Sequence, residues 1–180
     1  LTAFEVFFQE RRPFFLENAD GFAFGETRTS NSNDPPSFFY SRRIGRAPQR
    51  RPAGDDIVAV GINAQTPIAG AFKLSGTTPS GWQIGVLNAT TPHEHAEVLR
   101  SNGRVTREGV EPLSNYHVSR LRRLLNGGNT GVGAFLSDTR RALDDSLLAA
   151  RVASSATVAG VDWEHAWLNR TYTISGVLSY

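Results

Sequence analysis

The chain has 180 residues, enough for one domain with a substantial core, and it contains no cysteine. Disulfides, thiolate metal sites and cysteine nucleophiles are therefore excluded. The 19 basic and 17 acidic side chains nearly cancel, leaving a net charge of +2, so we predict no nucleic-acid partner. The sequence has no apolar run of about eighteen residues that would make a transmembrane helix, so a membrane-spanning form would have to cross as strands.

The first third of the chain is rich in phenylalanine and arginine. Nine of the eleven Phe lie within residues 1–39, and eight of the eighteen Arg lie within residues 1–51. Five prolines in this stretch exclude long helices and central strands. We therefore expect residues 1–56 to form an ordered, loop-rich segment held by arginine–carboxylate pairs and aromatic packing. The opening residues, LTAFEVFF, are typical of the interior or end of a strand, so we interpret the chain as a piece of a longer protein.

From Asp56 onward, strand-like runs alternate with turn signals. Residues 68–76 and 82–90 flank the sequence TTPSG, which predicts a hairpin. A longer polar connection over 91–113 follows. Within it we expect a helical turn at His95 to Arg100, before a turn at Asn102-Gly103.

A second hairpin is predicted from residues 115–125 and 130–140. They flank Asn126-Gly127-Gly128-Asn129, whose glycines supply the positive φ that tight turns need. Residues 142–153 have helix-like spacing, although periodicity alone leaves helix or strand open, and we expect a strand from about Ala153. Residues 158–168 and 172–180 then predict a last hairpin over Asn169-Arg170.

The clearest alternation lies in the last nine residues, YTISGVLSY. Tyr172, Ile174, Leu178 and Tyr180 share one face with a glycine, and small or polar residues dominate the other. About nine to eleven such residues, tilted, suffice to cross a bilayer, so the strand is typical of a membrane barrel. The half-buried sheets of a soluble antiparallel sandwich show the same alternation, so this strand alone leaves both architectures open.

Taken together, these patterns predict an all-β fold. We expect an antiparallel hairpin array of about six strands, with alternately short and long connections, as part of a transmembrane-type β-barrel. The chain is interpreted as a single fragment of a larger barrel domain, with a loop-rich insert over 1–56 and hairpins over 57–180. Such barrels need at least about eight strands, so this piece has too few to close.

Three groups of residues resemble catalytic or metal sites. The first, His93, Glu94, His95 and Glu97, lacks a second cluster at a recognised metal-ligand spacing. A triad drawn around His165 with Asp162 and Glu164 lacks a G-x-S-x-G nucleophile elbow. The third, Glu10, Glu17 and Asp20, has the chemistry of an acid–base pair, but these carboxylates also neutralise the neighbouring arginines. We therefore predict no catalytic, cofactor-binding or metal-binding residues and do not favour an enzyme.

Arginines within strands are the better candidates for a functional role. An arginine in a barrel avoids lipid, so Arg120 and Arg122, with Arg123 beside them, should face the lumen or lie beyond the membrane. There they either form a structural ion-pair network or set anion preference. The candidate interfacial aromatics are Trp82, Trp163, Tyr172 and Tyr180, together with Trp167 and Tyr116; core packing is the alternative role.

Several phrases resemble one bacterial family. They include ERRPFFLENAD, FYSRRIGRAP, IAGAFKLSGTTPSGWQIGVLNATT, EPLSNYHVSRLRRLLNGGNTGVGAFLSDTRR and GVDWEHAWLNRTYTISG. They run in the order seen in a large C-terminal domain of unknown function that follows a family-nine-like carbohydrate-binding domain. The resemblance covers nearly all of the chain. It implies a barrel-like domain in the outer membrane of Gram-negative bacteria, with no established catalytic residues.

The leading hypothesis is a segment of an outer-membrane β-barrel protein with a channel, transport or surface-assembly role. Its expected partners are outer-membrane lipid, the barrel-assembly machinery and, through a separate N-terminal module, carbohydrate. The alternative is part of a carbohydrate-binding or carbohydrate-active surface hydrolase, in which aromatics stack on sugars and two of Glu10, Glu17 and Asp20 act as acid and base. A soluble all-β interaction domain is the third interpretation.

Overall fold

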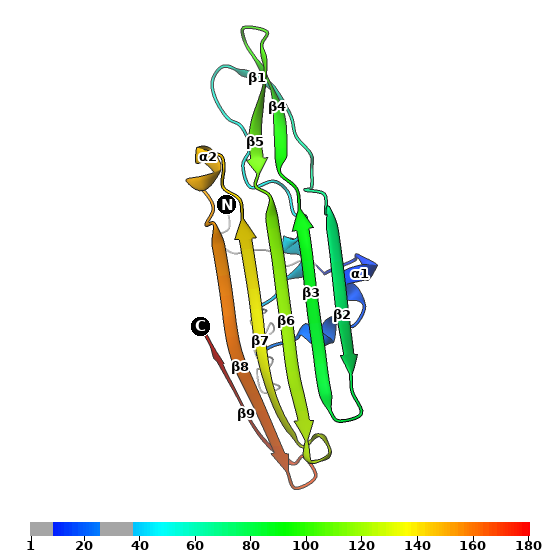
Figure 1. Ribbon diagram of the computed structural model, residues 1–180. Helices are drawn as coiled ribbons and strands as arrows, with labels where there is room; N and C mark the ends of the chain where they lie inside the picture. Colours follow the sequence, from blue (N-terminus) through cyan, green and yellow to red (C-terminus); the bar gives the residue numbers. More distant parts are fainter. Residues whose placement is uncertain (1–8, 26–37) are drawn as a thin grey trace.

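The computed structural model describes residues 9–25 and 38–180, an all-β arrangement of antiparallel strands with a few short helices (Figure 1). The strands are β1 (Ile57–Gly61), β2 (Gly70–Thr77), β3 (Trp82–Thr91), β4 (Glu94–Arg100), β5 (Val105–Glu111), β6 (Ser114–Leu125), β7 (Thr130–Arg141), β8 (Ser155–Trp167) and β9 (Tyr172–Ser179). The helices are α1 (Pro13–Leu16), α2 (Ser146–Ala149) and the 3-10 helices η1 (Ala19–Phe22), η2 (Ser41–Arg43) and η3 (Asn126–Gly128).

Six of the strands form one antiparallel sheet in the order β2-β3-β6-β7-β8-β9. The strands β4 and β5 leave this sheet and pair with β1 in a second sheet of order β1-β4-β5. Short turns join β2 to β3, β6 to β7 and β8 to β9 at one end of the six-stranded sheet, and the longer connections lie at the other end (Figure 1). The expected alternation of short and long connections is confirmed.

The three predicted hairpins of the six-stranded sheet are present, each with an uninterrupted register. In the turn between β6 and β7, Gly127 and Gly128 have φ values of 64° and 89°, as the sequence predicts. The last hairpin turns through Leu168, Asn169 and Arg170, all with positive φ. The short helix α2 and the start of β8 at Ser155 agree with the division expected near Ala153.

The helical turn expected at His95 to Arg100 is wrong, because these residues lie in β4. Within that strand Ala96 and Val98 are fully buried and pack with Val110 of β5, whereas Glu97 is exposed. This alternation is the period of a strand, and pairing with β5 on one side and β1 on the other outweighs the helix-like composition. The strand β1 was not predicted; four of its five residues pair with β4.

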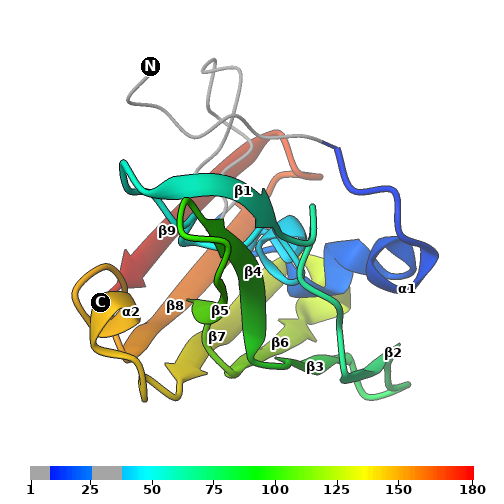
Figure 2. The same cartoon turned by 90° about the horizontal axis from the view of Figure 1, so that it is seen from above.

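The six-stranded sheet is curved, and the described N-terminal residues lie on its concave side (Figure 2). Residues 9–25 and 38–50 are called the N-terminal segment below. Its aromatic and aliphatic side chains pack against inward-facing residues of β3, β6 and β7. The buried members of this core are Phe15, Phe22, Phe24, Ile44, Leu87, Ala89, Tyr116, Val118 and Phe135. Aromatic packing therefore holds the segment in place, as expected.

Phe24 carries much of this docking. Its ring is 4% exposed and stacks on Phe135, with 4.8 Å between the ring centroids. The ring also lies directly on the backbone of β8, because a Cβ at Gly160 would meet the Phe24 Cζ atom at 2.4 Å. A larger residue than glycine at position 160 would displace the ring.

We expect Phe24→Ala to lower the free energy of unfolding by about 3–5 kcal/mol, because it removes a buried aromatic and leaves a cavity against the sheet. Denaturant unfolding followed by tryptophan fluorescence measures this change. Phe14→Ala is the matched control: Phe14 is 37% exposed, and we expect a loss of roughly 1 kcal/mol. Equal losses for the two variants would contradict the role given to Phe24.

Candidate functional site

The six-stranded sheet has two faces of opposite character. The face directed away from the N-terminal segment is called the outer face, and the concave face is called the inner face. One row of directly paired residues crosses five strands on the outer face: Ile84, Leu121, Ala134, Val161 and Leu178. The four large side chains of this row remain between 37% and 69% exposed. A continuous apolar row therefore faces outward.

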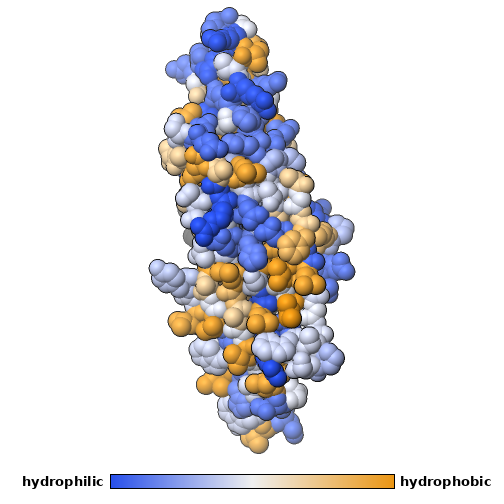
Figure 3. Space-filling view, in the orientation of Figure 1, coloured by the Kyte–Doolittle hydropathy of each residue, from blue (hydrophilic) through white to orange (hydrophobic). Residues whose placement is uncertain are grey.

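Neighbouring rows extend this apolar surface into a band. The outer band consists of Leu74, Trp82, Ile84, Val86, Leu121, Leu125, Val132, Ala134, Leu136, Ala159, Val161, Trp163, Trp167, Tyr172, Ile174, Leu178 and Tyr180. Along β8 it runs from Ala159 to Trp167, which is about 27 Å of strand. Figure 3 shows hydrophobic side chains gathered over the lower half of this face.

Toward the long connections the same face becomes polar within one row. Asn88, His117, Asp138 and Thr157 are paired directly across β3, β6, β7 and β8. The carboxylate of Asp138 accepts hydrogen bonds from Thr157 and from Arg140. The outer face is thus divided by height along the strands, with a sharp border between the outer band and this polar row.

Aromatic side chains mark both borders of the outer band. Near the short turns, the Trp167 and Tyr172 rings stack with centroids 5.8 Å apart, and the Arg123 guanidinium lies 4.8 Å from the ring centroid of Trp82. Toward the polar row, Tyr180 exchanges two backbone hydrogen bonds with Ala159, at 2.8 and 3.0 Å.

The structure places all four aromatics that the sequence proposes as interfacial, Trp82, Trp163, Tyr172 and Tyr180, on the outer face. Tyr116 differs, because it faces inward and belongs to the core, where it is 8% exposed.

Arg120, Arg122, Asp162 and Glu164 lie on the inner face, and Arg120 is the most deeply buried of them. Its side chain is 4% exposed and donates to Asp162 Oδ2 at 2.6 Å. It also donates to the backbone oxygens of Ala23 at 2.9 Å and Ala134 at 3.2 Å. The guanidinium lies flat on β7, because a Cβ at Gly133 would meet its Nη1 atom at 2.2 Å. Arg120 therefore ties the N-terminal segment to β8.

Arg122 lies one inward position further along β6 and faces Glu164 of β8 at 3.6 Å. Glu164 also accepts a 2.7 Å hydrogen bond from Arg170. Both arginines that the sequence proposes as lumen-facing therefore lie on the inner face and pair with acidic residues of β8. Arg123, their neighbour in sequence, points to the outer face.

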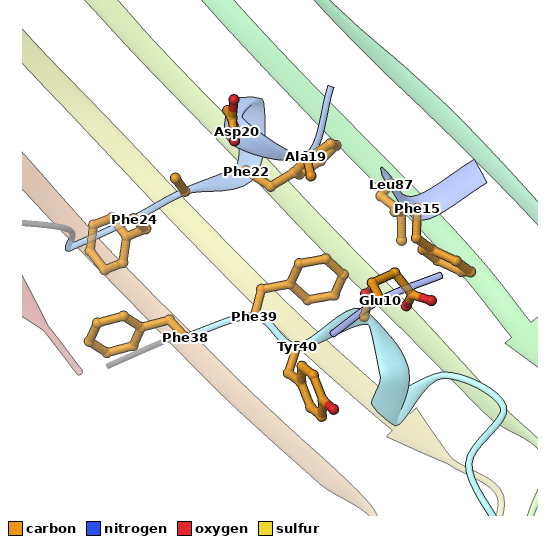
Figure 4. Close-up of a pocket in the computed structure, with 12 residues that line it drawn as sticks. Glu10, Phe15, Ala19, Asp20, Phe22, Phe24, Phe38, Phe39, Tyr40 and Leu87 are labelled. Carbon is orange, nitrogen blue, oxygen red and sulfur yellow. Dashed lines mark hydrogen bonds between the residues drawn. The ribbon is translucent and has the colours of Figure 1, made fainter. Parts of the chain in front are cut away.

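An aromatic cavity of about 270 Å³ lies between the N-terminal segment and the sheet (Figure 4). Glu10 borders it and accepts hydrogen bonds from Arg12 Nη2 at 2.7 Å and from Ser41 Oγ at 2.6 Å. Burial raises the pKa of Glu10, but the hydrogen bonds from Arg12 and Ser41 outweigh it and lower the pKa from 4.5 to about 2. Glu10 is therefore ionised at neutral pH, which opposes a general-acid role.

Lys73 of β2 extends this polar cluster along the segment. Its ammonium donates to the backbone oxygens of Phe14 and Glu17. Glu17 and Asp20, the other two carboxylates considered for acid–base chemistry, are exposed. Glu10 is thus engaged by charge pairing, and Lys73 is engaged by backbone carbonyl groups.

The other candidates from the sequence do not assemble into sites. His165 lies on the outer face, where it contacts Thr130 and stacks on Trp167. Asp162 and Glu164 lie on the inner face. Alternate residues of a strand point to opposite faces, so these three side chains cannot form a triad. The rings of His93 and His95 stack at 5.2 Å. Among the described residues, no group of three or more His, Asp or Glu side chains could hold a metal ion. No helix in the described part of the chain is long and apolar enough to cross a membrane.

Sequence reasoning missed the contacts between the N-terminal segment and the second sheet. Arg50 is 8% exposed and donates to the Gly109 oxygen at 2.8 Å and to Glu108 at 2.5 Å. Glu111, 1% exposed, accepts from the Gln49 amide nitrogens at 2.8 and 3.1 Å. Their partners are about sixty residues away, so no local pattern could reveal them.

The chain matches a domain of unknown function, DUF5916, over residues 1–180. This chain belongs to the DUF5916 family. Comparison with curated proteins and with solved structures found no match.

Removing Arg120 should strongly destabilise this DUF5916 chain. We expect Arg120→Met to lower the free energy of unfolding by about 3–5 kcal/mol, because Asp162 is left without its partner. The double variant with Asp162→Leu should recover a large part of the loss, which a double-mutant cycle in denaturant measures. Arg122→Met is the control, with an expected loss of about 1 kcal/mol or less, since its pair is longer and more exposed. Strictly additive losses at 120 and 162 would refute the coupling.

The lowered pKa of Glu10 predicts a pH dependence. Folding favours the ionised form of Glu10, so ionised Glu10 stabilises the folded state. This contribution is complete above pH 4.5 and is lost as the pH falls through about 2. Arg12 is 36% exposed, and the surrounding solvent weakens its interaction with Glu10. We therefore expect Glu10 to contribute roughly 2 kcal/mol to the free energy of unfolding at neutral pH. The difference in unfolding free energy between wild type and Glu10→Gln, measured from pH 7 to pH 2, should shrink over this range. A difference that stays constant would contradict the assignment; Glu17→Gln, at an exposed site, serves as control.

Proposed function

We propose that this DUF5916 chain is a segment of an outer-membrane β-barrel protein with a channel, transport or surface-assembly role. In this proposal the outer band contacts lipid and the N-terminal segment lies inside the barrel. The observation that carries it is the outer band itself. Soluble monomers rarely expose a contiguous apolar patch on this scale. With the strand tilt of such barrels, about 27 Å of strand corresponds to a height of about 20 Å, close to the apolar band of known barrels.

The distribution of charge supports the same proposal. The two central rows of the outer band, through Val161 and through Leu136, contain no charged residue. Arg120, Arg122, Asp162 and Glu164 from the same strands all face inward. A charge facing lipid is costly, whereas a charge paired inside a barrel is not, so a barrel wall requires this separation.

A soluble sandwich would need a second layer over the outer band. In the described residues, the second sheet lies beyond the long-connection end of the six-stranded sheet and leaves the outer face uncovered (Figure 1). A barrel has a further requirement, because strand edges are not tolerated in lipid. Closing it requires further strands along β2 and β9, the two edges of the six-stranded sheet.

The proposed location, the outer membrane of a Gram-negative bacterium, rests on the proposed barrel, because barrels of this kind belong to that membrane. Lipid and the barrel-assembly machinery are then the expected partners. The alternative of a carbohydrate-active hydrolase is less well supported. Glu10 is held ionised by Arg12 and Ser41, which leaves only the exposed Glu17 and Asp20 for acid–base work.

The direct test is membrane fractionation of the protein expressed from its complete gene in a Gram-negative host. We expect retention in the outer membrane after a carbonate wash, and a shift in gel mobility between boiled and unboiled samples. Release into the wash as a soluble species would overturn the proposal.

Arginine substitutions test which face meets lipid. Val161→Arg, in the central row, should reduce assembly by the equivalent of about 2–4 kcal/mol, and Ile174→Arg, nearer the short turns, should cost less. Ser175→Arg is the matched control, because it places the same charge on the inner face opposite Glu164. The folded fraction in the outer membrane is read from the same gel shift. If Val161→Arg assembles as well as Ser175→Arg, the outer face does not contact lipid.

A further inference from the structure

A second cavity, of about 430 Å³, lies between the N-terminal segment and the inner face of β6 and β7. It is distinct from the Arg120 contacts. Three arginines line it, Arg43, Arg46 and Arg141. A cavity of this volume is large enough for one ring-sized ligand.

Arg46 and Arg141 have no carboxylate partner among the described residues that line this cavity. Asp138 is the only carboxylate among the described residues that line it. Both oxygens of Asp138 are already engaged, one by Thr157 and the other by Arg140 at 2.8 Å. These partners lie on the outer face, so the carboxylate is directed away from the cavity.

Two of the arginines have unused donors. The Nη1 atom of Arg141 donates to the Ala153 oxygen at 3.0 Å, whereas its Nη2 atom makes no hydrogen bond in the described part of the chain. In the described part of the chain, the side chain of exposed Arg46 makes no hydrogen bond or ion pair. These guanidinium donors are available to an acceptor that a ligand in the cavity supplies.

The rest of the lining suits a hydroxylated ligand. Ser137 and Thr139 face inward, because they pair with the core residues Val118 and Tyr116. Both residues line the cavity, and the buried side chain of Ile44 adds an apolar wall. Hydroxyl donors, an apolar wall and guanidinium groups thus line the same cavity.

We infer that this cavity binds a small hydroxylated organic anion, of the size of one sugar acid or sugar phosphate. The planar guanidinium group matches a carboxylate or a phosphate through paired hydrogen bonds. The inference does not rest on the proposed membrane location, since it depends only on how the N-terminal segment packs on the inner face.

Calorimetric titration of the purified complete protein tests the inference with three probes: glucuronate, glucose 6-phosphate and glucose. We expect saturable binding of at least one of the two anions and none of glucose. Binding of glucuronate alone indicates a carboxylate ligand, and binding of glucose 6-phosphate alone indicates a phosphate ligand. Absence of binding by both anions at millimolar concentration, or equal binding of glucose, would overturn the inference.

Variants locate the binding to this cavity. Arg46→Gln should weaken the affinity by about tenfold or more, as expected for the loss of a charged hydrogen bond, and Thr139→Val should weaken it by a smaller factor. Arg46 is chosen over Arg141 because it is exposed, so its loss leaves the fold intact. Arg104→Gln, in the exposed turn between β4 and β5, removes the same charge elsewhere and should leave the affinity unchanged. An unchanged affinity of Arg46→Gln, or an equal effect of Arg104→Gln, would refute the site.

Discussion

The two-residue period of the strands, fixed by continuous pairing from β2 to β9, is the constraint on which the rest of the structure depends. A slip of one residue in β6 would exchange the positions of Arg120 and Leu121. A charge would then enter the apolar outer face, and a leucine would lie beside Asp162. A slipped register is therefore unfavourable, because it would mix charged and apolar side chains on both faces. The native register keeps them on separate faces.

The inner face accepts the N-terminal segment because the sheet offers it both space and partners. Glycines at 133 and 160 leave room for the Arg120 guanidinium and the Phe24 ring against the backbone. The Arg120 guanidinium then donates hydrogen bonds both to Asp162 and to a backbone oxygen of the segment. The segment in turn covers the charged face of the sheet, so that Arg120 is both paired and buried.

Local sequence patterns predicted the strands, the turns and the faces well wherever a segment follows the two-residue period of a strand throughout. The Asn-Gly-Gly-Asn turn and the alternation of Tyr172 to Tyr180 required no knowledge of distant residues. The error at His95 to Arg100 arose because burial of Ala96 and Val98 depends on β1 and β5. Composition alone gave no sign that these residues would leave the six-stranded sheet and form a separate one.

The sequence by itself determined that the protein is all-β, where most of its hairpins turn, and that Arg120 and Arg122 share a face opposite Leu121. Alternation along a strand is a local property, so it can be recognised in the sequence without knowing which strand or segment packs against it. Only the tertiary structure decided that this face meets the N-terminal segment, that Asp162 and Glu164 neutralise its arginines, and that a cavity opens beside Arg46 and Arg141. These contacts join residues far apart in the chain, and their geometry depends on how the curved sheet and the segment pack together.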